Sequence, residues 1–492
     1  MSFKNEYDEL TTSEKFLTHL CKDTFLNLWS WPHIYRKQRW SGGEGKEVCD
    51  LLVVFDRNII IFSDKYCEFP DTGDLLTDWC RWFKKAVFKS AKQVWGAERW
   101  IRQYSDKLYI DKNCTIPFPY PLPNIEQATF HRIVVAHGSA FRCRKELGGS
   151  GSLLINPSII GEQHYNPELE MIQPFTIGRL SKDKGFIHVL DDFNLHIVLQ
   201  TVDTITDFTN YLEKKQRYVE SGKLMMAAGE EDLLAAYFRK LNADGDHDFK
   251  YPEKADLIVL QEGFWEDFQT HPDRISQLEA DKISYAWDEL IDKFSVHILG
   301  QTLYNPSHVE ISDHEIGLRI LASEPRTRRR MLSRSLMQVL ERAEREVRSV
   351  RVVSGVNDSE PYYVFLSLDK TNDLSDVEYR NVRQHLLENY CLAAKVKFPK
   401  AKQIIGIATE PISHKKRSED LIYIDASKWT KKNQEDAEKI RNEFNLLVNA
   451  KMYHKIENEF PRQEIEDFKK GKNRNKPCYC GSGKKYKKCC GK

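Results

Sequence analysis

Four cysteines lie within the last fifteen residues of the 492-residue chain, with the spacing C-x-C-x8-C-C. They are Cys478, Cys480, Cys489 and Cys490. Four thiolates so close together suit one tetrahedral Zn²⁺, and the glycines between them allow the tight turn that returns the chain to the metal. The alternative is a basic tail with cysteines placed by chance. We expect a structural zinc module at 477–492, reached through a charged linker at 453–476.

The segment "PCYCGSGKKYKKCCG" resembles the SEC-C motif, the zinc-binding C-terminus of the bacterial preprotein translocase ATPase. The last ligand in that family is His or Cys, and Cys490 fits the Cys form. The resemblance implies zinc binding and docking to a protein partner, and it implies no catalysis. From Lys469 to Lys492 the chain has ten Lys or Arg and no Asp or Glu. The tail could therefore also meet a phosphate backbone.

A second set of reactive side chains lies in the first 120 residues. Asp50 is part of the apolar run "EVCDLLVVF", and Ser63-Asp64-Lys65 ends the next run, "IIIFSDKYC". The residues between these runs, Asp56-Arg57-Asn58, predict a β-hairpin that sets Asp50 opposite Ser63–Lys65. Closely placed carboxylates suit Mg²⁺, which takes hard oxygen ligands. A lysine beside them can stabilise charge on a phosphate or orient the attacking water.

This order of elements resembles the PD-(D/E)xK nuclease superfamily: a helix with Glu14, a strand with Asp50, a strand ending in Ser63-Asp64-Lys65, then a helix. The resemblance implies a restriction-endonuclease-like α/β domain at 1–120 and Mg²⁺-dependent hydrolysis of phosphodiester bonds. It also adds Gln93, which matches a polar position of exonuclease-like members.

One position departs from the superfamily pattern. Side chains alternate along a strand, so Ser63 and Lys65 share a face and Asp64 points away. A serine therefore occupies the place of an expected acid, and some members of the superfamily recruit an acid from the following helix instead. Asp74 and Asp78 are four residues apart and would share a helix face. The candidates for the missing ligand are Asp64, Asp74, Asp78 and Glu47.

A helical stretch from about Asp74 to Tyr104 interleaves basic and aromatic residues. Its cations are Arg81, Lys84, Lys85, Lys89, Lys92, Arg99 and Arg102, and its aromatics are Trp79, Trp82, Phe83, Phe88, Trp95 and Trp100. A basic, aromatic face suits phosphates and unstacked bases. The alternative is an aromatic core with solvated lysines on the outer face.

The remaining chain predicts further domains rather than a second site. Strand-like runs such as "HRIVVAHG", "GFIHVLDD" and "LHIVLQTV" indicate a β-rich unit, in which His131 and His137 share a strand face as structural histidines. A cluster of arginines from Arg326 to Arg334 opens a helix that also has several glutamates, so we expect a solvated face. The expected domains are the nuclease-like 1–120, a β-rich 126–225, a helical 229–310 and an α/β mixed-sheet 315–452.

Composition sets limits on the function. Hydrophobic residues make up 41% and charged residues 30%, which is ordinary for a soluble protein. Lys plus Arg is 74 and Asp plus Glu is 73, so the net charge of +1 excludes a whole-chain polyelectrolyte. No apolar run approaches the roughly 18 residues of a membrane span. The N-terminus has no signal-peptide pattern, so we expect a cytoplasmic protein.

Together these features predict a multidomain α/β nuclease that binds nucleic acid, with a partner-docking zinc tail. The other hypothesis is a non-catalytic adaptor with a degenerate nuclease fold. The seven remaining cysteines are scattered singly and are expected to be small buried hydrophobes.

Overall fold

The structure is a computed structural model. It describes residues 11–38, 44–120, 122–169, 172–239, 241, 245–250, 255–299, 311–355, 361–370, 373–414, 417–452, 457–461, 474–476 and 484–488. The chain forms two compact units, Met1–His271 and Pro272–Lys492.

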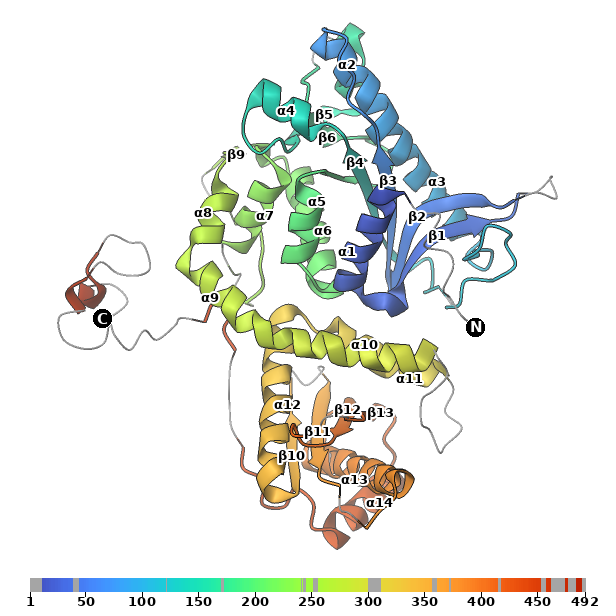
Figure 1. Ribbon diagram of the computed structural model, residues 1–492, viewed down its shortest axis with the longest axis vertical. Helices are drawn as coiled ribbons and strands as arrows, with labels where there is room; N and C mark the ends of the chain where they lie inside the picture. Colours follow the sequence, from blue (N-terminus) through green and yellow to red (C-terminus); the bar gives the residue numbers. More distant parts are fainter. Residues whose placement is uncertain are drawn as a thin grey trace. The chain divides into compact units, whose positions relative to one another are not determined.

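A five-stranded mixed sheet is the centre of the first unit (Figure 1). Its strands, in spatial order, are β1 (Ser30–Arg36), β2 (Lys46–Phe55), β3 (Asn58–Tyr66), β4 (Thr129–His137) and β7 (His188–Asp191). β1, β2 and β3 are antiparallel neighbours, whereas β3, β4 and β7 run parallel. The sheet therefore joins strands from both sides of the boundary that we expected near residues 120–126.

The expected hairpin between β2 and β3 is confirmed. Leu51 pairs with Phe62, and Phe55 pairs with Asn58 across the turn. Asp56 adopts a positive φ of 51° in that turn, a conformation in which Asp is among the better tolerated residues. The hairpin fixes the register of every polar residue at its open end.

Helices cover both faces of this sheet. α1 (Thr12–Trp29) is capped by Thr11, with Glu14 completing a capping box, and its Phe25 packs against Phe62 of β3. On the opposite face lie α2 (Leu75–Trp82), the π-helical segment η2 (Phe83–Phe88) and α3 (Lys89–Gln103), which form one continuous helical stretch.

The aromatic residues of α2, η2 and α3 belong to the core. Trp79, Trp82, Phe83 and Trp95 are buried, and Phe88 and Trp100 pack against them partly buried. The lysines and arginines between them point to solvent. Of the two possibilities for this stretch, the aromatic core with a basic outer face is the observed one.

A second mixed sheet has the order β6-β5-β8-β9. Its strands are β5 (Leu154–Ile160), β6 (Thr176–Arg179), β8 (Leu224–Ala227) and β9 (Ile258–Leu260). The other helices of the unit are α4 (Ala140–Leu147), η3 (Gly161–His164), η4 (Pro167–Leu169), α5 (Asn194–Thr201), α6 (Ile205–Glu220), α7 (Glu230–Phe238) and α8 (Phe264–Thr270). The run "LHIVLQTV", expected as a strand, is helix α5, because a short apolar run does not distinguish a buried helix from a strand.

The second unit has a four-stranded mixed sheet of order β10-β11-β12-β13. Its strands are β10 (Arg348–Val353), β11 (Tyr362–Leu368), β12 (Gln403–Thr409) and β13 (Asp420–Asp425). Its helices are α9 (Pro272–Asp281), η5 (Lys282–Ser284), α10 (Tyr285–Leu299), α11 (Ile311–Ser323), α12 (Arg326–Glu346), α13 (Asp376–Lys397), α14 (Lys431–Glu443) and η7 (Tyr486–Lys488).

The chain is thus a multidomain mixed α/β protein. Among the described residues, no helix is both long and apolar enough to cross a bilayer. Seven cysteines are buried with free thiols, as expected: Cys21, Cys49, Cys67, Cys80, Cys114, Cys143 and Cys391.

Candidate functional site

Asp50 lies at the open end of the β2–β3 hairpin and is 8% exposed. Because Leu51 pairs with Phe62, the next position places Asp50 opposite Ser63. The Asp64 backbone N–H donates to Asp50 Oδ2 at 2.6 Å, and the Ser63 side chain also hydrogen-bonds to the Asp50 carboxyl group. The hairpin therefore brings the Asp50 carboxylate to the first residue of the Ser63-Asp64-Lys65 run.

Further acids lie around Asp50. Glu47 Oε1 is 2.5 Å from His33 Nδ1, on the neighbouring strand β1. Burial lowers the pKa of His33, but its hydrogen bond to Glu47 and the charges of Glu47, Glu14 and Asp50 raise it above the usual value overall. We call Glu47 and Asp50, with His33 and Ser63, the β2 carboxylate cluster. The Glu14 carboxylate lies in the α1 capping box, where it accepts the Thr11 backbone N–H at 2.7 Å.

The Asp50 carboxyl group titrates abnormally. Burial raises its pKa to about 7, and the Glu47 charge adds to the effect. No ion pair of Asp50 occurs among the described residues. A buried acid held beside a second acid in this way is typical of functional sites. Lys65 shares the face of Ser63 by strand alternation and is exposed at the end of β3.

Asp64 points to the opposite face of the sheet, as strand alternation predicts, and takes part in a different network. Its Oδ1 atom is 2.7 Å from His137 Nε2, and His137 Nδ1 is 3.0 Å from Asp192 Oδ1. Asp192 Oδ2 also accepts the Gly138 backbone N–H at 2.8 Å. These groups meet at the carboxyl ends of the parallel strands β3, β4 and β7.

His137 is held as a doubly hydrogen-bonded imidazolium. Burial lowers its pKa, but the carboxylates of Asp192 and Asp64 outweigh that effect and raise the pKa to about 9. With both ring nitrogens bound to carboxylates, His137 has no lone pair for a metal. Asp64 Oδ2 is buried without a hydrogen-bond partner among the described atoms. These hydrogen bonds connect the ends of β3, β4 and β7. His137 thus has a structural role, as expected.

The close approach of β3 and β4 at this edge depends on a glycine. Gly138 follows His137 with a φ of +102°, and a Cβ there would lie 2.0 Å from the Cys67 carbonyl oxygen. Only glycine therefore fits this position. It keeps the end of β3, where Lys65 lies, against the end of β4.

The other predicted catalytic residues lie elsewhere or have local partners. Asp74 caps α2 and accepts the Leu76 N–H and the Thr77 hydroxyl. Asp78 is fully buried and accepts both the backbone N–H and the hydroxyl of Thr72. Gln93 lies exposed on α3. Both acids of α2 thus hold the segment that leads into the helix.

The donors around Asp50 limit which metal could bind. Among the described residues, no group of three or more His, Cys, Asp or Glu side chains is arranged to hold a metal ion. Mg²⁺ commonly binds through one or two carboxylates, several waters and the substrate phosphate. Asp50 and Glu47 fit that kind of site, and they do not fit a complete all-protein cage.

The four zinc-ligand candidates, Cys478, Cys480, Cys489 and Cys490, lie outside the described residues. Two neighbouring segments are described. The Tyr486 backbone N–H donates to the Lys476 carbonyl at 2.9 Å, and Tyr486 is buried. This bond joins the described segments 474–476 and 484–488.

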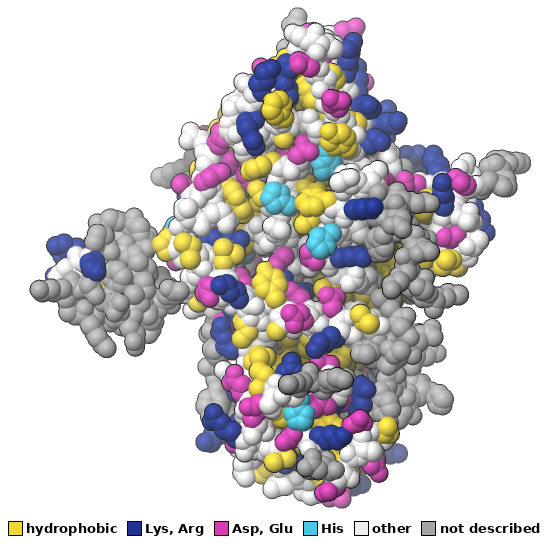
Figure 2. All heavy atoms as spheres, in the orientation of Figure 1, with side chains coloured by type: hydrophobic (Ala, Val, Ile, Leu, Met, Phe, Trp, Pro, Cys, Tyr) yellow, Lys and Arg dark blue, Asp and Glu magenta, His cyan; other side chains and the backbone are white. Residues whose placement is uncertain are grey.

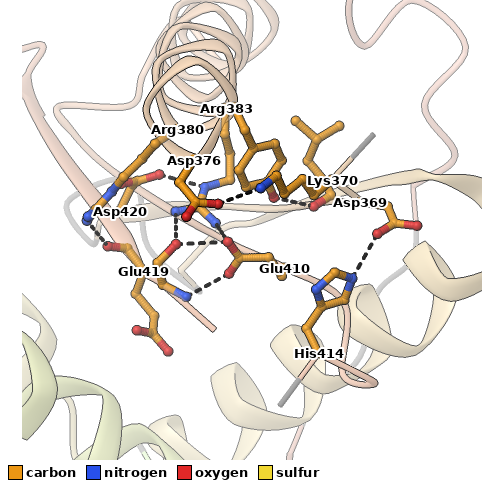
Figure 3. Close-up of polar contacts among 12 residues, drawn as sticks. Asp369, Lys370, Asp376, Arg380, Arg383, Glu410, His414, Glu419 and Asp420 are labelled. Carbon is orange, nitrogen blue, oxygen red and sulfur yellow. Dashed lines mark hydrogen bonds and ion pairs between the residues drawn. The ribbon is translucent and has the colours of Figure 1, made fainter. Parts of the chain in front are cut away.

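The second unit has a polar cluster at the carboxyl ends of β11 and β12 (Figure 3). Arg383 of α13 is fully buried and pairs with Glu410 at 2.7 Å and with Asp420 at 2.7 Å. Arg380 reaches Asp420 at 3.0 Å, and His414 lies 2.9 Å from Asp369 at the rim. The two arginines balance the two buried acids, so the cluster stabilises the junction of α13, β12 and β13.

The arginine cluster that opens α12 is not a solvated face, contrary to our expectation. Arg329 and Arg330 are buried and pair with Asp288 and Asp281. Arg330 also donates to the Asn458 carbonyl at 2.9 Å. The arginines are buried because α12 packs against α9, α10 and the segment 457–461. Helical periodicity alone does not predict these contacts.

Comparisons with known proteins concern only the C-terminal part of the chain. The SEC-C motif family matches residues 474–492. The protein translocase subunit SecA of Geobacter sulfurreducens is 46% identical over 59 residues, which is 12% of this chain and 7% of that protein. SecA of Trichlorobacter lovleyi is 46% identical over 61 residues, with the same shares. The chain thus covers only a small fraction of these relatives, and no solved structure matches it.

Proposed function

We propose that the first unit is a Mg²⁺-dependent nuclease whose site is the open end of the β2–β3 hairpin. The observation that carries the proposal is the state of Asp50: a buried carboxyl group beside Glu47, with its pKa raised to about 7 and no ion pair among the described residues. A bound divalent cation would compensate this charge.

Each residue of the site has a defined part in the proposed reaction. Asp50 and Glu47 would hold Mg²⁺, which when bound would supply Lewis acidity at the phosphate and a more acidic water. Lys65 is exposed on the face of Ser63, where its ammonium group can stabilise negative charge on the scissile phosphate. Ser63 positions Asp50 through its hydrogen bond. Asp64 and His137 would have a structural part only: their hydrogen bond holds the ends of β3 and β4 together.

A cleavage assay tests this proposal. Purified full-length protein is incubated with DNA and with RNA, in Mg²⁺ and in Mn²⁺, beside the variants Lys65→Ala and Lys182→Ala. Lys182 is an exposed lysine of the same unit and serves as the matched control. We expect Lys65→Ala to cleave at least about 100-fold more slowly and Lys182→Ala to match the native rate.

A second candidate is a nucleic-acid or protein adaptor that does not cleave. It is favoured by Ser63 at the usual acid position and by the hydrogen bonds that hold Asp74 and Asp78 near α2. Native protein that binds nucleic acid but cleaves neither DNA nor RNA would support the adaptor and contradict the nuclease.

For the C-terminal tail we propose a zinc module that docks a protein partner. Cys478, Cys480, Cys489 and Cys490 would bind one Zn²⁺, and the match of 474–492 to the SEC-C motif supports this ligand set.

We also propose that the protein is cytoplasmic, since the seven described thiols are free and buried, as in a reducing compartment.

A further inference from the structure

A row of basic side chains follows the outer face of α2, η2 and α3. We call it the α2–α3 basic stripe, and its members are Arg81, Lys84, Lys85, Lys89, Lys92 and Arg99. All six are exposed, while the residues between them form the core of the first unit. Figure 2 shows Lys and Arg side chains along the outline of the molecule that α2 and α3 form in Figure 1.

Acids compensate little of the stripe's charge: Asp74, the N-cap of α2, interacts electrostatically with Arg81. None of its six members forms an ion pair with another described residue. Between Trp79 and Tyr104 the single acid is Glu98, which is buried and neutralised by Arg132 and Arg102. In a chain of net charge +1, the stripe is a local concentration of positive charge that the rest of this helical face does not offset.

The π-helical segment adds to this concentration. Lys84 and Lys85 are consecutive residues of η2, and both are exposed. A π-helix inserts an extra residue into the helical turn and is frequent at functional sites. From Arg81 to Arg99 the stripe extends over about 27 Å, at about 1.5 Å per residue. That length corresponds to about eight base-pair steps of a duplex.

The apolar residues of the stretch decide which polyanion fits. Among the described residues of α2, η2 and α3, Leu76 at the start of α2 is the one large hydrophobic side chain that is exposed. A membrane-bound amphipathic helix needs a free apolar face, but this one is buried against the sheet. A protein interface normally has aromatic or apolar anchors at its centre, and single-strand binding uses exposed rings for base stacking. A surface of cations alone suits phosphates.

We propose that the α2–α3 basic stripe binds double-stranded nucleic acid through its phosphate backbone, without reading its bases. The inference rests on the proposed function only for its purpose, which is to hold a duplex for cleavage. The stripe could bind a duplex whether or not Asp50 supports cleavage. Binding through phosphates is strongly salt-dependent, with a slope of about −0.9 per neutralised phosphate.

The test measures duplex affinity as a function of salt, with full-length protein and no added divalent cation. The variant Arg81→Gln/Lys85→Gln/Lys89→Gln removes three stripe charges, none of which forms an ion pair with another described residue. We expect it to bind at least about tenfold more weakly near 0.1 M salt, with a salt slope smaller by about 2.7. The basic C-terminal tail is unchanged in this variant, so any binding through the tail cancels in the comparison.

The matched control is Lys431→Gln/Lys432→Gln/Lys439→Gln, which removes the same charge from exposed positions of α14. It should leave both affinity and slope near the native values. Equal losses in the two variants would show an effect of net charge and overturn the proposal. Tighter binding to anionic vesicles or to single strands than to duplexes would also overturn it.

The outcome is separable from that of the nuclease proposal. Protein that binds duplexes through the stripe and cleaves nothing would retain this inference and refute the nuclease. Protein that cleaves nucleic acid but binds duplexes equally well without the three charges would retain the nuclease proposal and refute this inference.

Discussion

Above about pH 7 the Asp50 carboxyl group is ionised although it is buried, and this lowers the free energy of unfolding. Its pKa is about 7 in the folded chain, against an ordinary 3.8. The folded state therefore binds a proton more tightly than the unfolded state, and the stability from this group is lost as pH rises through about 7. The function proposed for Asp50 therefore conflicts with the stability of the fold at this residue.

This conflict predicts that Asp50→Asn is more stable than native protein at pH 8. Three pKa units correspond to an upper limit of about 4 kcal/mol, so we expect a Tm increase on the order of 5 °C by calorimetry. The difference should shrink at pH 5, where native Asp50 is protonated, and in Mg²⁺, which stabilises the native chain by binding. A lower Tm at pH 8 would contradict this description of Asp50.

His137 predicts a pH dependence of the same sign, at higher pH. Its pKa is raised from 6.5 to about 9 by Asp192 and Asp64. Its contribution is therefore complete below about 6.5 and is lost as pH rises through about 9. We expect His137→Gln to destabilise the protein by an additional 3 kcal/mol or so at pH 6 relative to pH 9.5, measured by urea unfolding. An equal loss at both pH values would show that the network is not charged.

At the scale of elements, α2 owes its start to two acids rather than to a metal. Asp74→Ala should lower the Tm slightly through the loss of an N-cap. Asp78→Ala should cost about 1–3 kcal/mol, because it leaves the Thr72 groups unpaired. Thermal unfolding measures both effects. Neither change should slow cleavage under conditions where the protein remains folded, and a folded but inactive Asp78→Ala would restore Asp78 as a recruited metal ligand.

How far the sequence predicts an element depends on the range of its contacts. The β2–β3 hairpin, the pairing of Asp50 with Ser63 and the opposite direction of Asp64 all follow from local turn and alternation rules. The parallel pairing of β3 with β4 and β7 joins segments far apart in the chain. The contact of Asp64 with His137 and Asp192 could not be predicted without that pairing.

The helical stretch after β3 shows a similar limit. Basic and aromatic residues alternate along it, and periodicity alone does not tell whether the aromatics pack inward or bind a ligand. In the structure, Trp79 and Trp82 of α2 and Phe83 of η2 are buried in the core of the first unit. His33 also lacked a signal, because its contact with Glu47 depends on the register of β1 against β2.

At the scale of the whole molecule, the tail should fold independently of the rest. It has almost no apolar core, so zinc would supply most of its folding free energy. We expect one zinc per chain by elemental analysis, lost in Cys478→Ser/Cys480→Ser. The variant's tail should become protease-sensitive while the Tm of the remaining chain is unchanged. Native protein without zinc would refute the metal site.

The central claim is that the carboxyl group of Asp50, and not the acids of α2, supports phosphodiester cleavage. The most direct measurement is the cleavage rate in Mg²⁺ at pH 8 for native protein, Asp50→Asn and Asp74→Asn. The two variants lose the same charge, one from the β2 carboxylate cluster and one from an exposed helix cap. We predict that Asp50→Asn loses cleavage by at least about 1000-fold, whereas Asp74→Asn retains the native rate. Equal rates for Asp50→Asn and native protein would contradict the account.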